Sequence, residues 1–277
     1  MSLFGKTRLP GKLVQADWLR KNLKKGLRIL DVRATFGQAT AGYPWGHIPG
    51  AFPFDPGSLF TLPPRRRLRS VEDLRRELEP LGFAQDARFV IYDETTRTSS
   101  TLTYWMLKSL GFREVSILDG GWQGWLVQGA PAEDSLPDFP RPAFEPSPDG
   151  SLLASTGEIA ERLGEIKLID ARTEKEFLKG HIPGAIWWPW TKNIRRDAES
   201  EWLESRDVLA ETAQSLGLSR DDEIVCYCNA GVAASHVCFV LDWLGFEKVR
   251  LYIGSWDEWS AEGLPVEAGR PGAPESA

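Results

Sequence analysis

The sequence predicts an α/β protein of two domains, each a mostly parallel sheet with helices on both faces. Three observations predict this class. The chain has 277 residues, which is more than a single hydrophobic core usually holds. Two long segments repeat at a spacing of about half the chain. Within each repeat, short apolar runs alternate with longer amphipathic ones, as expected for parallel strands joined by helices.

The repeat is visible in two pairs of segments. "ILDVRATFGQATAGYPWGHIPGAFPFD" begins at Ile29 and is matched by "LIDARTEKEFLKGHIPGAIWWPW", which begins at Leu168. Further along, the segment that begins at Phe89 is matched by the segment that begins at Ile224. Solenoid units are far shorter than this. We therefore expect two copies of one domain.

The domain boundaries follow from the repeat and from proline. We expect an N-terminal domain over residues 9–130 and a C-terminal domain over residues 151–268. Between them, residues 131–150 are rich in proline, which can continue neither a helix nor a sheet ladder. This segment is predicted to be an extended linker.

The elements of the second copy can be placed in order. Ser155 and Glu158 have the spacing of a capping box, which predicts the start of a helix. Apolar runs and helical patterns then alternate. The expected elements are the strand "KLID", a helix from Asp207 to Leu216, the strand "EIVCY", a helix from about Val232 to Leu244, and the strand "KVRLY".

Four polar side chains stand where the predicted strands end. Asp31 and Asp93 end strands of the first copy, and Asp170 and Cys228 end strands of the second. Ligands of such sheets bind beyond the carboxyl ends of the strands. The sequence therefore predicts a site at this edge.

The loop after Cys228 is predicted to be an anion-binding cup. Its small residues can turn their N–H groups inward, and the following helix N-terminus adds to the positive potential. Such a cup favours thiolate over thiol, so we expect a lowered pKa and a nucleophilic or persulfide-bearing sulfur. A core cysteine at the end of a strand is the structural alternative. The expected cup residues are Asn229, Ala230, Gly231, Val232 and Ala233.

The other cysteines have simpler interpretations. Cys226 is either buried in the strand or able to resolve an oxidised Cys228. Cys238 lies among apolar residues and is expected to pack in the core. His236 and Cys238 are two apart on a helix and face different directions, so a zinc site is not expected. His236 is read as a helix-surface or core residue.

Composition excludes several function classes. The net charge is −6, so nothing in the balance of charges favours nucleic acid or an anionic membrane as partner. No apolar run approaches the roughly 20 residues of a transmembrane helix, and the N-terminus lacks the apolar core of a signal peptide. Three cysteines are too few for a disulfide framework. We expect a cytoplasmic protein with reduced thiols and no cofactor.

The combination of motifs resembles the tandem rhodanese-type sulfurtransferases, over nearly the whole chain. It consists of Cys228 with its loop, two "GHIPGA" segments that contain His47 and His181, and "GSWDEW" near the end. The resemblance implies two rhodanese domains, of which the second is active and the first is inactive. The active cysteine, Cys228, would take sulfur from a small donor, hold it as a persulfide and pass it to an acceptor. Asp93 stands where Cys228 stands in the other copy, and a carboxylate cannot form a persulfide.

The histidines and arginines have either structural or binding roles. The Pro-Gly pair of "GHIPGA" predicts a turn, so His181 is read as structural. His47 is either structural or, as the resemblance implies for mercaptopyruvate-using members, part of a catalytic relay. Arg33 and Arg172 recur in both copies and are read as members of internal ion pairs. Two further basic groups are either solvated or in the cleft: Lys192, Arg195 and Arg196, and Arg65, Arg66, Arg67 and Arg69.

The donor is predicted to be thiosulfate rather than 3-mercaptopyruvate. Members that use mercaptopyruvate carry a serine of the relay in the loop and a substrate-binding arginine, where this chain has Ala230 and Glu176. The acceptor is expected to be a thiol, cyanide or a protein. Two alternatives remain open: a 3-mercaptopyruvate sulfurtransferase, and a non-enzymatic persulfide carrier or sulfur-sensing module.

Overall fold

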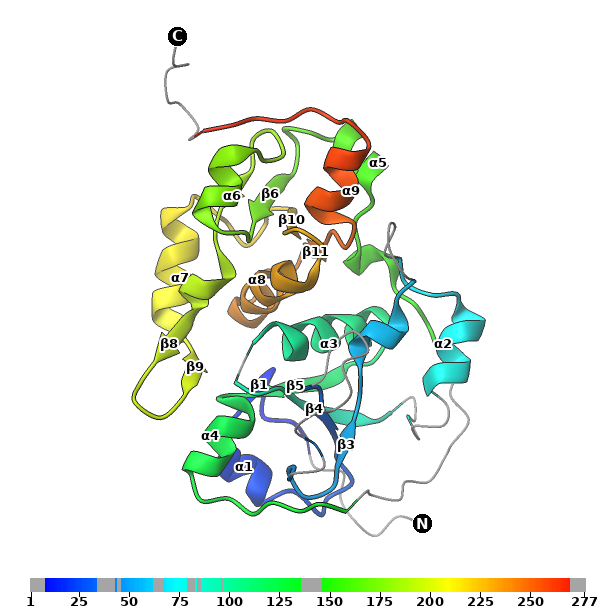
Figure 1. Cartoon of the computed structure of the whole chain (residues 1–277), viewed down its shortest axis with the longest axis vertical. Helices are drawn as coiled ribbons and strands as arrows, with labels where there is room; N and C mark the ends of the chain where they lie inside the picture. The colour runs from blue at the N-terminus through cyan, green and yellow to red at the C-terminus, as the bar shows by residue number, and fades with distance from the viewer. Residues whose placement is uncertain are drawn as a thin grey trace. The chain divides into compact units, whose positions relative to one another are not determined.

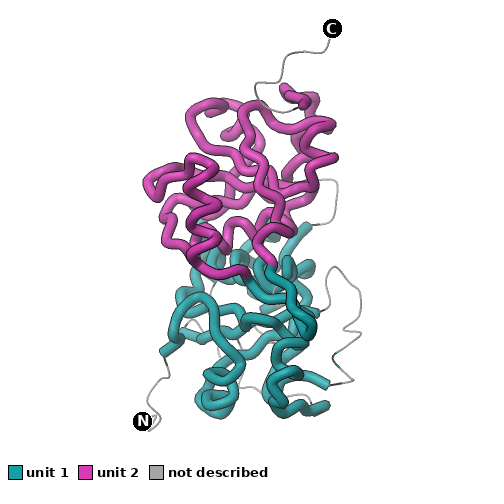
Figure 2. The backbone as a smooth tube through the Cα atoms, turned by 90° about the vertical axis from the view of Figure 1, so that its left-hand side faces the viewer, with its two compact units in different colours: residues 1–61, 68–149, 195–203 teal, residues 62–67, 150–194, 204–277 magenta. Residues whose placement is uncertain are grey.

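The computed structural model divides into two compact units, coloured separately in Figure 2. It describes residues 8–33, 43, 46–61, 67–78, 83, 86–95, 97–135 and 146–269. Unit 1 contains residues 1–61, 68–149 and 195–203, and unit 2 contains residues 62–67, 150–194 and 204–277. The predicted linker at 131–150 is counted with unit 1 except for its last residue, and its residues 136–145 lie outside the described chain.

Unit 1 is built on a five-stranded parallel sheet in the order β1-β5-β4-β2-β3. Helices α1 and α4 pack on one face through Leu19 and Trp125, and α3 covers β4 and β5 from the other face (Figure 1). Its elements are β1 (Leu13–Val14), α1 (Ala16–Arg20), β2 (Arg28–Asp31), β3 (Ala51–Pro53), a 3-10 turn (Pro56–Leu59), α2 (Val71–Leu78), β4 (Arg88–Tyr92), α3 (Thr98–Ser109), β5 (Glu114–Leu118) and α4 (Gly121–Val127).

Unit 2 is built on a four-stranded parallel sheet in the order β11-β10-β6-β7. Its elements are a 3-10 turn (Gly150–Leu152), α5 (Thr156–Glu161), β6 (Lys167–Asp170), α6 (Glu174–Lys179), β7 (Ile186–Trp187), a 3-10 turn (Trp190–Asn193), α7 (Arg206–Ser215), β10 (Ile224–Tyr227), α8 (Val232–Leu244), β11 (Val249–Leu251) and α9 (Ser255–Ala261). The predicted helices and strands therefore lie within about a residue of their expected positions.

The alternation of side chains along β10 explains the layers of unit 2. Val225 and Tyr227 face one side of the sheet, where they pack with α5, α6 and α9. Ile224 and Cys226 point to the opposite side because successive strand residues alternate, and α8 packs against β10 there. Helix α7 lies outside α8. This three-layer arrangement confirms the predicted fold class.

A β-hairpin from the second half of the sequence belongs to unit 1. Strands β8 (Ile194–Arg196) and β9 (Glu201–Leu203) pair with each other. The Leu203 N–H donates to Asp119 at 3.0 Å, and the Glu201 carboxylate accepts from Thr95 and Arg97. The Trp202 ring lies where a side chain at Gly120 would have to go. The boundaries expected from the sequence place residues 194–203 in the C-terminal domain, because long-range contacts leave no local signal.

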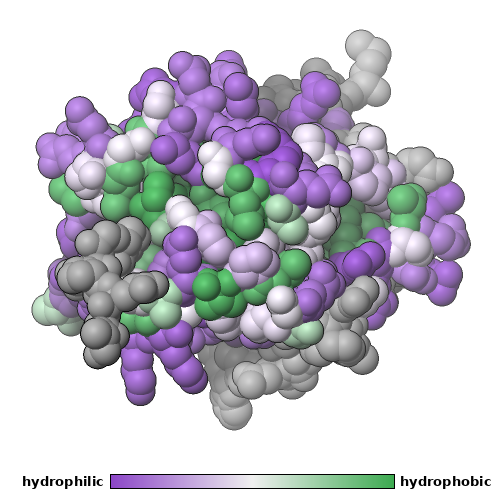
Figure 3. Space-filling view, turned by 90° about the horizontal axis from the view of Figure 1, so that it is seen from above, coloured by the Kyte–Doolittle hydropathy of each residue, from purple (hydrophilic) through white to green (hydrophobic). Residues whose placement is uncertain are grey.

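The described part of the chain contains no candidate membrane-spanning helix. None of the helices found there is both long and apolar enough to cross a bilayer. Figure 3 shows one face of the molecule, on which apolar patches are interleaved with hydrophilic residues. Large exposed apolar side chains are scattered, as on most protein surfaces: Val71, Leu126, Val127, Val208 and Val266.

Candidate active site

Cys228 directly follows β10, at the carboxyl edge of the sheet of unit 2. Its N–H donates to the Ser255 hydroxyl at 3.2 Å, and its carbonyl accepts from the Trp256 N–H at 2.9 Å. The residue is only 4% exposed. Both bonds come from the turn that begins α9, so the start of this helix fixes the backbone around the thiol.

The loop after Cys228 surrounds its sulfur with N–H groups. The backbone N–H groups of Ala234, Ala230, Ala233 and Gly231 act on the thiol. Gly231 is the N-cap of α8 and has φ +81°, a conformation that favours glycine. A Cβ there would lie 2.9 Å from the Ile253 Cα, so no larger residue fits without a shift. Of the five expected cup residues, Ala230, Gly231 and Ala233 direct N–H groups at the thiol, and Ala234 does so as well.

The predicted direction of the thiol pKa is wrong. Burial raises the pKa of the Cys228 thiol, and the surrounding N–H groups only partly oppose that rise. The sequence showed the donors but not that the sulfur would be enclosed, and desolvation disfavours the charged thiolate. The raised pKa therefore keeps the Cys228 sulfur mostly in the thiol form at neutral pH.

Ser255 carries a strained backbone that sequence reasoning missed. Its φ is +54°, and it is the only non-glycine residue with positive φ among the described residues. This conformation costs of the order of 1 kcal/mol or more for an L-residue. In this conformation the Ser255 hydroxyl accepts the Cys228 N–H. The same hydroxyl donates to the Tyr252 carbonyl at 2.6 Å. The "GSWDEW" segment, which contains this serine, was the available signal.

A carboxylate is hydrogen-bonded to the residue that follows the cysteine. Asn229 donates from its side chain to Glu176 at 2.8 Å. Glu176 also forms a capping box with Thr173 at the start of α6. Hydrogen bonds from Thr173 and Asn229 lower the pKa of Glu176, so it is ionised at neutral pH. Sequence reasoning identified Glu176 by its position and missed its capping role.

Only half of the capping box expected at Ser155 and Glu158 forms. The Ser155 hydroxyl accepts the Glu158 N–H at 3.4 Å, as expected. The Glu158 carboxylate, however, accepts from Arg250 at 2.6 Å. A guanidinium is a stronger partner for a carboxylate than a backbone N–H. Spacing alone could not reveal that competitor.

A buried ion pair supports the strand end in each unit. Arg172 binds Asp170 at 2.6 Å and the Gly180 carbonyl at 2.7 Å. Arg33 binds Asp31 and the Gly46 carbonyl at the same two distances, 2.6 and 2.7 Å. The guanidinium of Arg172 lies 4.4 Å from the Trp256 ring. The predicted internal ion pairs are confirmed.

The same backbone geometry recurs around Asp93 in unit 1. The Asp93 carbonyl accepts from Trp122 at 2.9 Å, as the Cys228 carbonyl does from Trp256. Gly121 has φ +53°, matching Ser255. The carboxylate accepts the N–H groups of Arg97 and Ser100, at 3.1 and 2.9 Å. A side-chain anion thus occupies the start of α3, where the thiol lies in the other unit.

Comparison with known proteins agrees with this repeated geometry. Residues 15–128 and 155–262 each match the family described as Rhodanese-like domain. The chain belongs to the rhodanese sulfurtransferase family.

Among curated relatives of this rhodanese, 3-mercaptopyruvate sulfurtransferase of Escherichia coli is 34% identical, over 92% of this chain and 97% of that protein. Sulfur carrier protein TtuD of Thermus thermophilus is 30% identical over 94% and 98%. A putative thiosulfate sulfurtransferase of Mycolicibacterium smegmatis is 30% identical over 93% and 98%. The crystal structure of SseA from Escherichia coli superposes with a TM-score of 0.79 at 31% identity, covering 89% of this chain and 99% of that one.

Both histidines of the "GHIPGA" segments are buried in this rhodanese. The His181 ring stacks on the Phe177 ring, and its Nδ1 is hydrogen-bonded to the Phe177 carbonyl at 2.9 Å. His47 stacks on Tyr43 with ring centroids 4.0 Å apart. Its Nε2 has no hydrogen-bond partner among the described residues. The parallel environments support a structural role for both.

The remaining cysteines and His236 lie in the core of unit 2. All three cysteines are free in the structure, and Cys226 and Cys238 are fully buried. His236 is also fully buried, and its Nδ1 lies 3.4 Å from the Asn193 side-chain nitrogen. Within the described part of the chain, no group of three or more His, Cys, Asp or Glu residues could hold a metal ion.

The basic residues considered for the donor have local partners. Lys192 lies 4.4 Å from the Trp187 ring, Arg196 binds Glu201 at 2.7 Å, and Arg195 lies 3.7 Å from Asp197. In the other group, the Arg69 guanidinium donates to the Phe60 carbonyl at 3.2 Å. Arg65 and Arg66 lie outside the described residues. The described contacts of these groups are therefore structural.

The buried carboxyl of Asp93 predicts a pH-dependent stability. Burial raises the pKa of Asp93 to about 6, against the opposing effect of the Ser100 and Arg97 N–H groups. The folded state then keeps a proton that the unfolded chain releases near its ordinary pKa of 3.8. Because the folded pKa is the higher one, the stabilisation is complete below the ordinary value and is lost as pH rises to about 6.

Replacing Asp93 with asparagine removes this titration and keeps an oxygen acceptor. We expect the parent to lose roughly 2.5 kcal/mol of stability relative to Asp93→Asn between pH 4 and pH 7. Urea unfolding of both proteins across this pH range measures the difference in their free energies of unfolding. The contributions of the other titrating groups are the same in both proteins and cancel in this difference. A difference that stays constant with pH would show that Asp93 is not the titrating group.

Proposed function

We propose that this rhodanese transfers sulfane sulfur from a small anionic donor to a thiophilic acceptor through a persulfide on Cys228. The observation that carries the proposal is the enclosed thiol at the end of β10 with four backbone N–H groups around it. A donor loses its sulfur to the Cys228 sulfur, and the acceptor then takes the outer sulfur and restores the thiol. The N–H groups stabilise the sulfur anions that both steps require.

The two units have different roles in this proposal. Unit 1 keeps the loop geometry but holds the Asp93 carboxyl in the place of the thiol. A carboxylate cannot carry a sulfane sulfur, so unit 1 is catalytically inactive. The domains are assigned as 9–130 and 151–268 with a linker at 131–150, the second one catalytic. We place the protein in the cytoplasm, with a thiol, cyanide or a protein as acceptor.

We favour thiosulfate over 3-mercaptopyruvate as donor. When the Cys228 sulfur takes the sulfur of mercaptopyruvate, the C–S bond breaks and pyruvate leaves as its enolate, which needs a cation for its carboxylate and a group to deliver a proton. The cup contains Ala230, which can deliver none, and the ionised Glu176 repels a carboxylate. Thiosulfate releases sulfite, a stable anion that needs no proton. The proposed cup residues are Asn229, Ala230, Gly231, Val232 and Ala233.

The charge of Glu176 gives a sharp test of donor binding. In Glu176→Gln the amide oxygen still accepts from Asn229, while the negative charge is gone. We expect the KM for thiosulfate to fall about threefold to tenfold with little change in kcat, because one like charge is removed near a dianion. Initial rates over a range of thiosulfate concentrations measure both parameters.

Two further sets of variants complete this test. Glu174→Gln removes a carboxylate from the same turn of α6 and should leave KM unchanged. Ala230→Lys should improve thiosulfate use, and Ala230→Ser should improve mercaptopyruvate use. If the parent prefers mercaptopyruvate by tenfold, about 1.4 kcal/mol of transition-state discrimination, the choice of donor is wrong.

A sulfur-carrier role is the second candidate. One curated relative, 30% identical to this chain, is named a sulfur carrier protein. A carboxylate at the cysteine loop also weakens the binding of anionic donors. An enzyme turns over repeatedly and saturates with donor, whereas a carrier takes one equivalent of sulfur and waits for its partner. Steady-state rates with thiosulfate and cyanide separate the two.

A further inference from the structure

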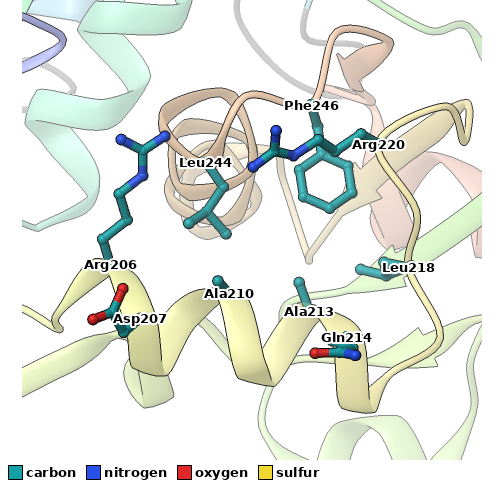
Figure 4. Close-up of a pocket in the computed structure, with 9 residues that line it drawn as sticks. All are labelled: Arg206, Asp207, Ala210, Ala213, Gln214, Leu218, Arg220, Leu244 and Phe246. Carbon is teal, nitrogen blue, oxygen red and sulfur yellow. The ribbon is translucent and has the colours of Figure 1, made fainter.

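Unit 2 has a groove between α7 and the carboxyl-terminal end of α8. It has a volume of about 300 Å³ and is open to solvent (Figure 4). Leu244 and Phe246 form its buried apolar floor, and Ala210 and Ala213 face them from α7. The two alanines are the reason for the space, because larger side chains at these adjacent positions of the helix face would fill it.

Two arginines stand at opposite ends of this floor. Arg206 is the first residue of α7, and Arg220 follows the end of the same helix. The helix has 10 residues and is therefore about 15 Å long. Figure 4 shows one guanidinium on each side of Leu244. Asp207 also lines the groove, but its carboxylate points away from the Arg206 guanidinium.

Both guanidinium groups are available for a ligand. The Arg206 guanidinium lies 5.8 Å from the Trp243 ring, which orients it without neutralising its charge. Among the described residues, no carboxylate forms a salt bridge with Arg206 or Arg220. Both side chains belong to exposed residues. In a chain with net charge −6, the two arginines outnumber the one carboxylate that lines the groove, that of Asp207, and leave the groove locally positive.

We propose that this groove binds a small amphipathic carboxylate. Its apolar body would cover Leu244 and Phe246, and its carboxylate would be held by an arginine, whose planar fork matches that group. A volume of about 300 Å³ is at the lower end of small-ligand sites.

The groove is separate from the sulfur site. Cys228 precedes the N-terminus of α8, whereas Leu244 is the last residue of that helix. The 13 residues of α8 span about 20 Å. The ligand is therefore not the sulfur donor, and its binding does not depend on the proposed function.

Titration calorimetry of the full chain with octanoate tests the proposal. Octanoate should bind, whereas 1-octanol, which lacks the charge, and acetate, which lacks the apolar body, should bind at least about tenfold more weakly. The double variant Arg206→Gln/Arg220→Gln should weaken octanoate binding by a similar factor. Ala210→Trp should abolish it by filling the groove. Arg113→Gln, at an exposed arginine of unit 1, is the matched control and should change nothing.

The structural alternative makes a different forecast. Arg220 could simply complement the carboxyl-terminal dipole of α8, in which case its replacement lowers the melting temperature and octanoate does not bind. Absence of octanoate binding at millimolar concentration, equal binding of 1-octanol, or unchanged binding in Ala210→Trp would each overturn the proposal. So would an acidic peptide that binds at this groove where octanoate does not.

Discussion

Cys228→Ser is expected to reduce sulfur transfer from thiosulfate to cyanide at least about 10³-fold, because the substitution removes the nucleophile on which both half-reactions depend. Serine preserves the size of the side chain and the hydrogen bonds of the backbone with Ser255 and Trp256. The loss would therefore come from chemistry and not from unfolding. Steady-state production of thiocyanate measures it, and circular dichroism confirms that the variant is folded.

The other two cysteines serve as controls for this result. Cys226→Ala and Cys238→Ala remove buried thiols without adding a buried hydroxyl. Both variants should keep turnover within a few-fold of the parent, at some cost in stability. A folded Cys226→Ala that loses turnover would show that Cys226 takes part in the reaction. Residual activity in Cys228→Ser at a tenth of the parent rate would remove Cys228 as the nucleophile.

Arg172→Met should destabilise unit 2 by about 3–5 kcal/mol, because it leaves the buried carboxylate of Asp170 without its counterion. Both side chains are almost fully buried, with 3% and 0% exposure. The Tyr227 phenol reports the same environment, since burial and the nearby Asp170 raise its pKa well above its ordinary value. Urea unfolding measures the loss, followed separately for each unit if two transitions appear.

Three variants isolate the cause of this destabilisation. Adding Asp170→Asn to Arg172→Met should recover part of the lost stability, because the unpaired charge is removed as well. Arg33→Met should destabilise unit 1 by a similar amount, since Arg33 makes the same bonds there. Arg20→Met breaks an exposed pair with Asp17 and should cost less than about 0.5 kcal/mol. A loss that persists undiminished in the double variant would mean that lost packing dominates.

The fold was largely predictable from local patterns. The helix expected from about Val232 to Leu244 is observed with these bounds, and the one expected at Asp207–Leu216 begins and ends one residue earlier. These elements depend on periodicity and on capping residues close in sequence. The hairpin of β8 and β9 was not predictable, because its place in unit 1 depends on contacts of Leu203 and Glu201 with residues about a hundred positions away.

The loop geometry at Cys228 was more predictable than its energetics. Position in the repeat and small side chains identified Cys228 and its loop. The direction of the thiol pKa required knowledge of how deeply the sulfur is buried, which depends on the turn at Ser255 and on Ile253 behind Gly231. The binding partner of Glu158 likewise depended on Arg250, which is distant in sequence. Contacts between residues that are distant in sequence decided both outcomes, and local sequence patterns do not reveal such contacts.

Intact mass spectrometry of the parent after incubation with thiosulfate tests the central claim most directly. A persulfide on Cys228 predicts a gain of about 32 Da, the mass of one sulfur, which cyanide removes and which peptide mapping locates at Cys228. Cys228→Ser should show no gain, while Cys226→Ala and Cys238→Ala should both show it. Turnover without any mass gain, or a persulfide mapped to Cys226, would contradict the account.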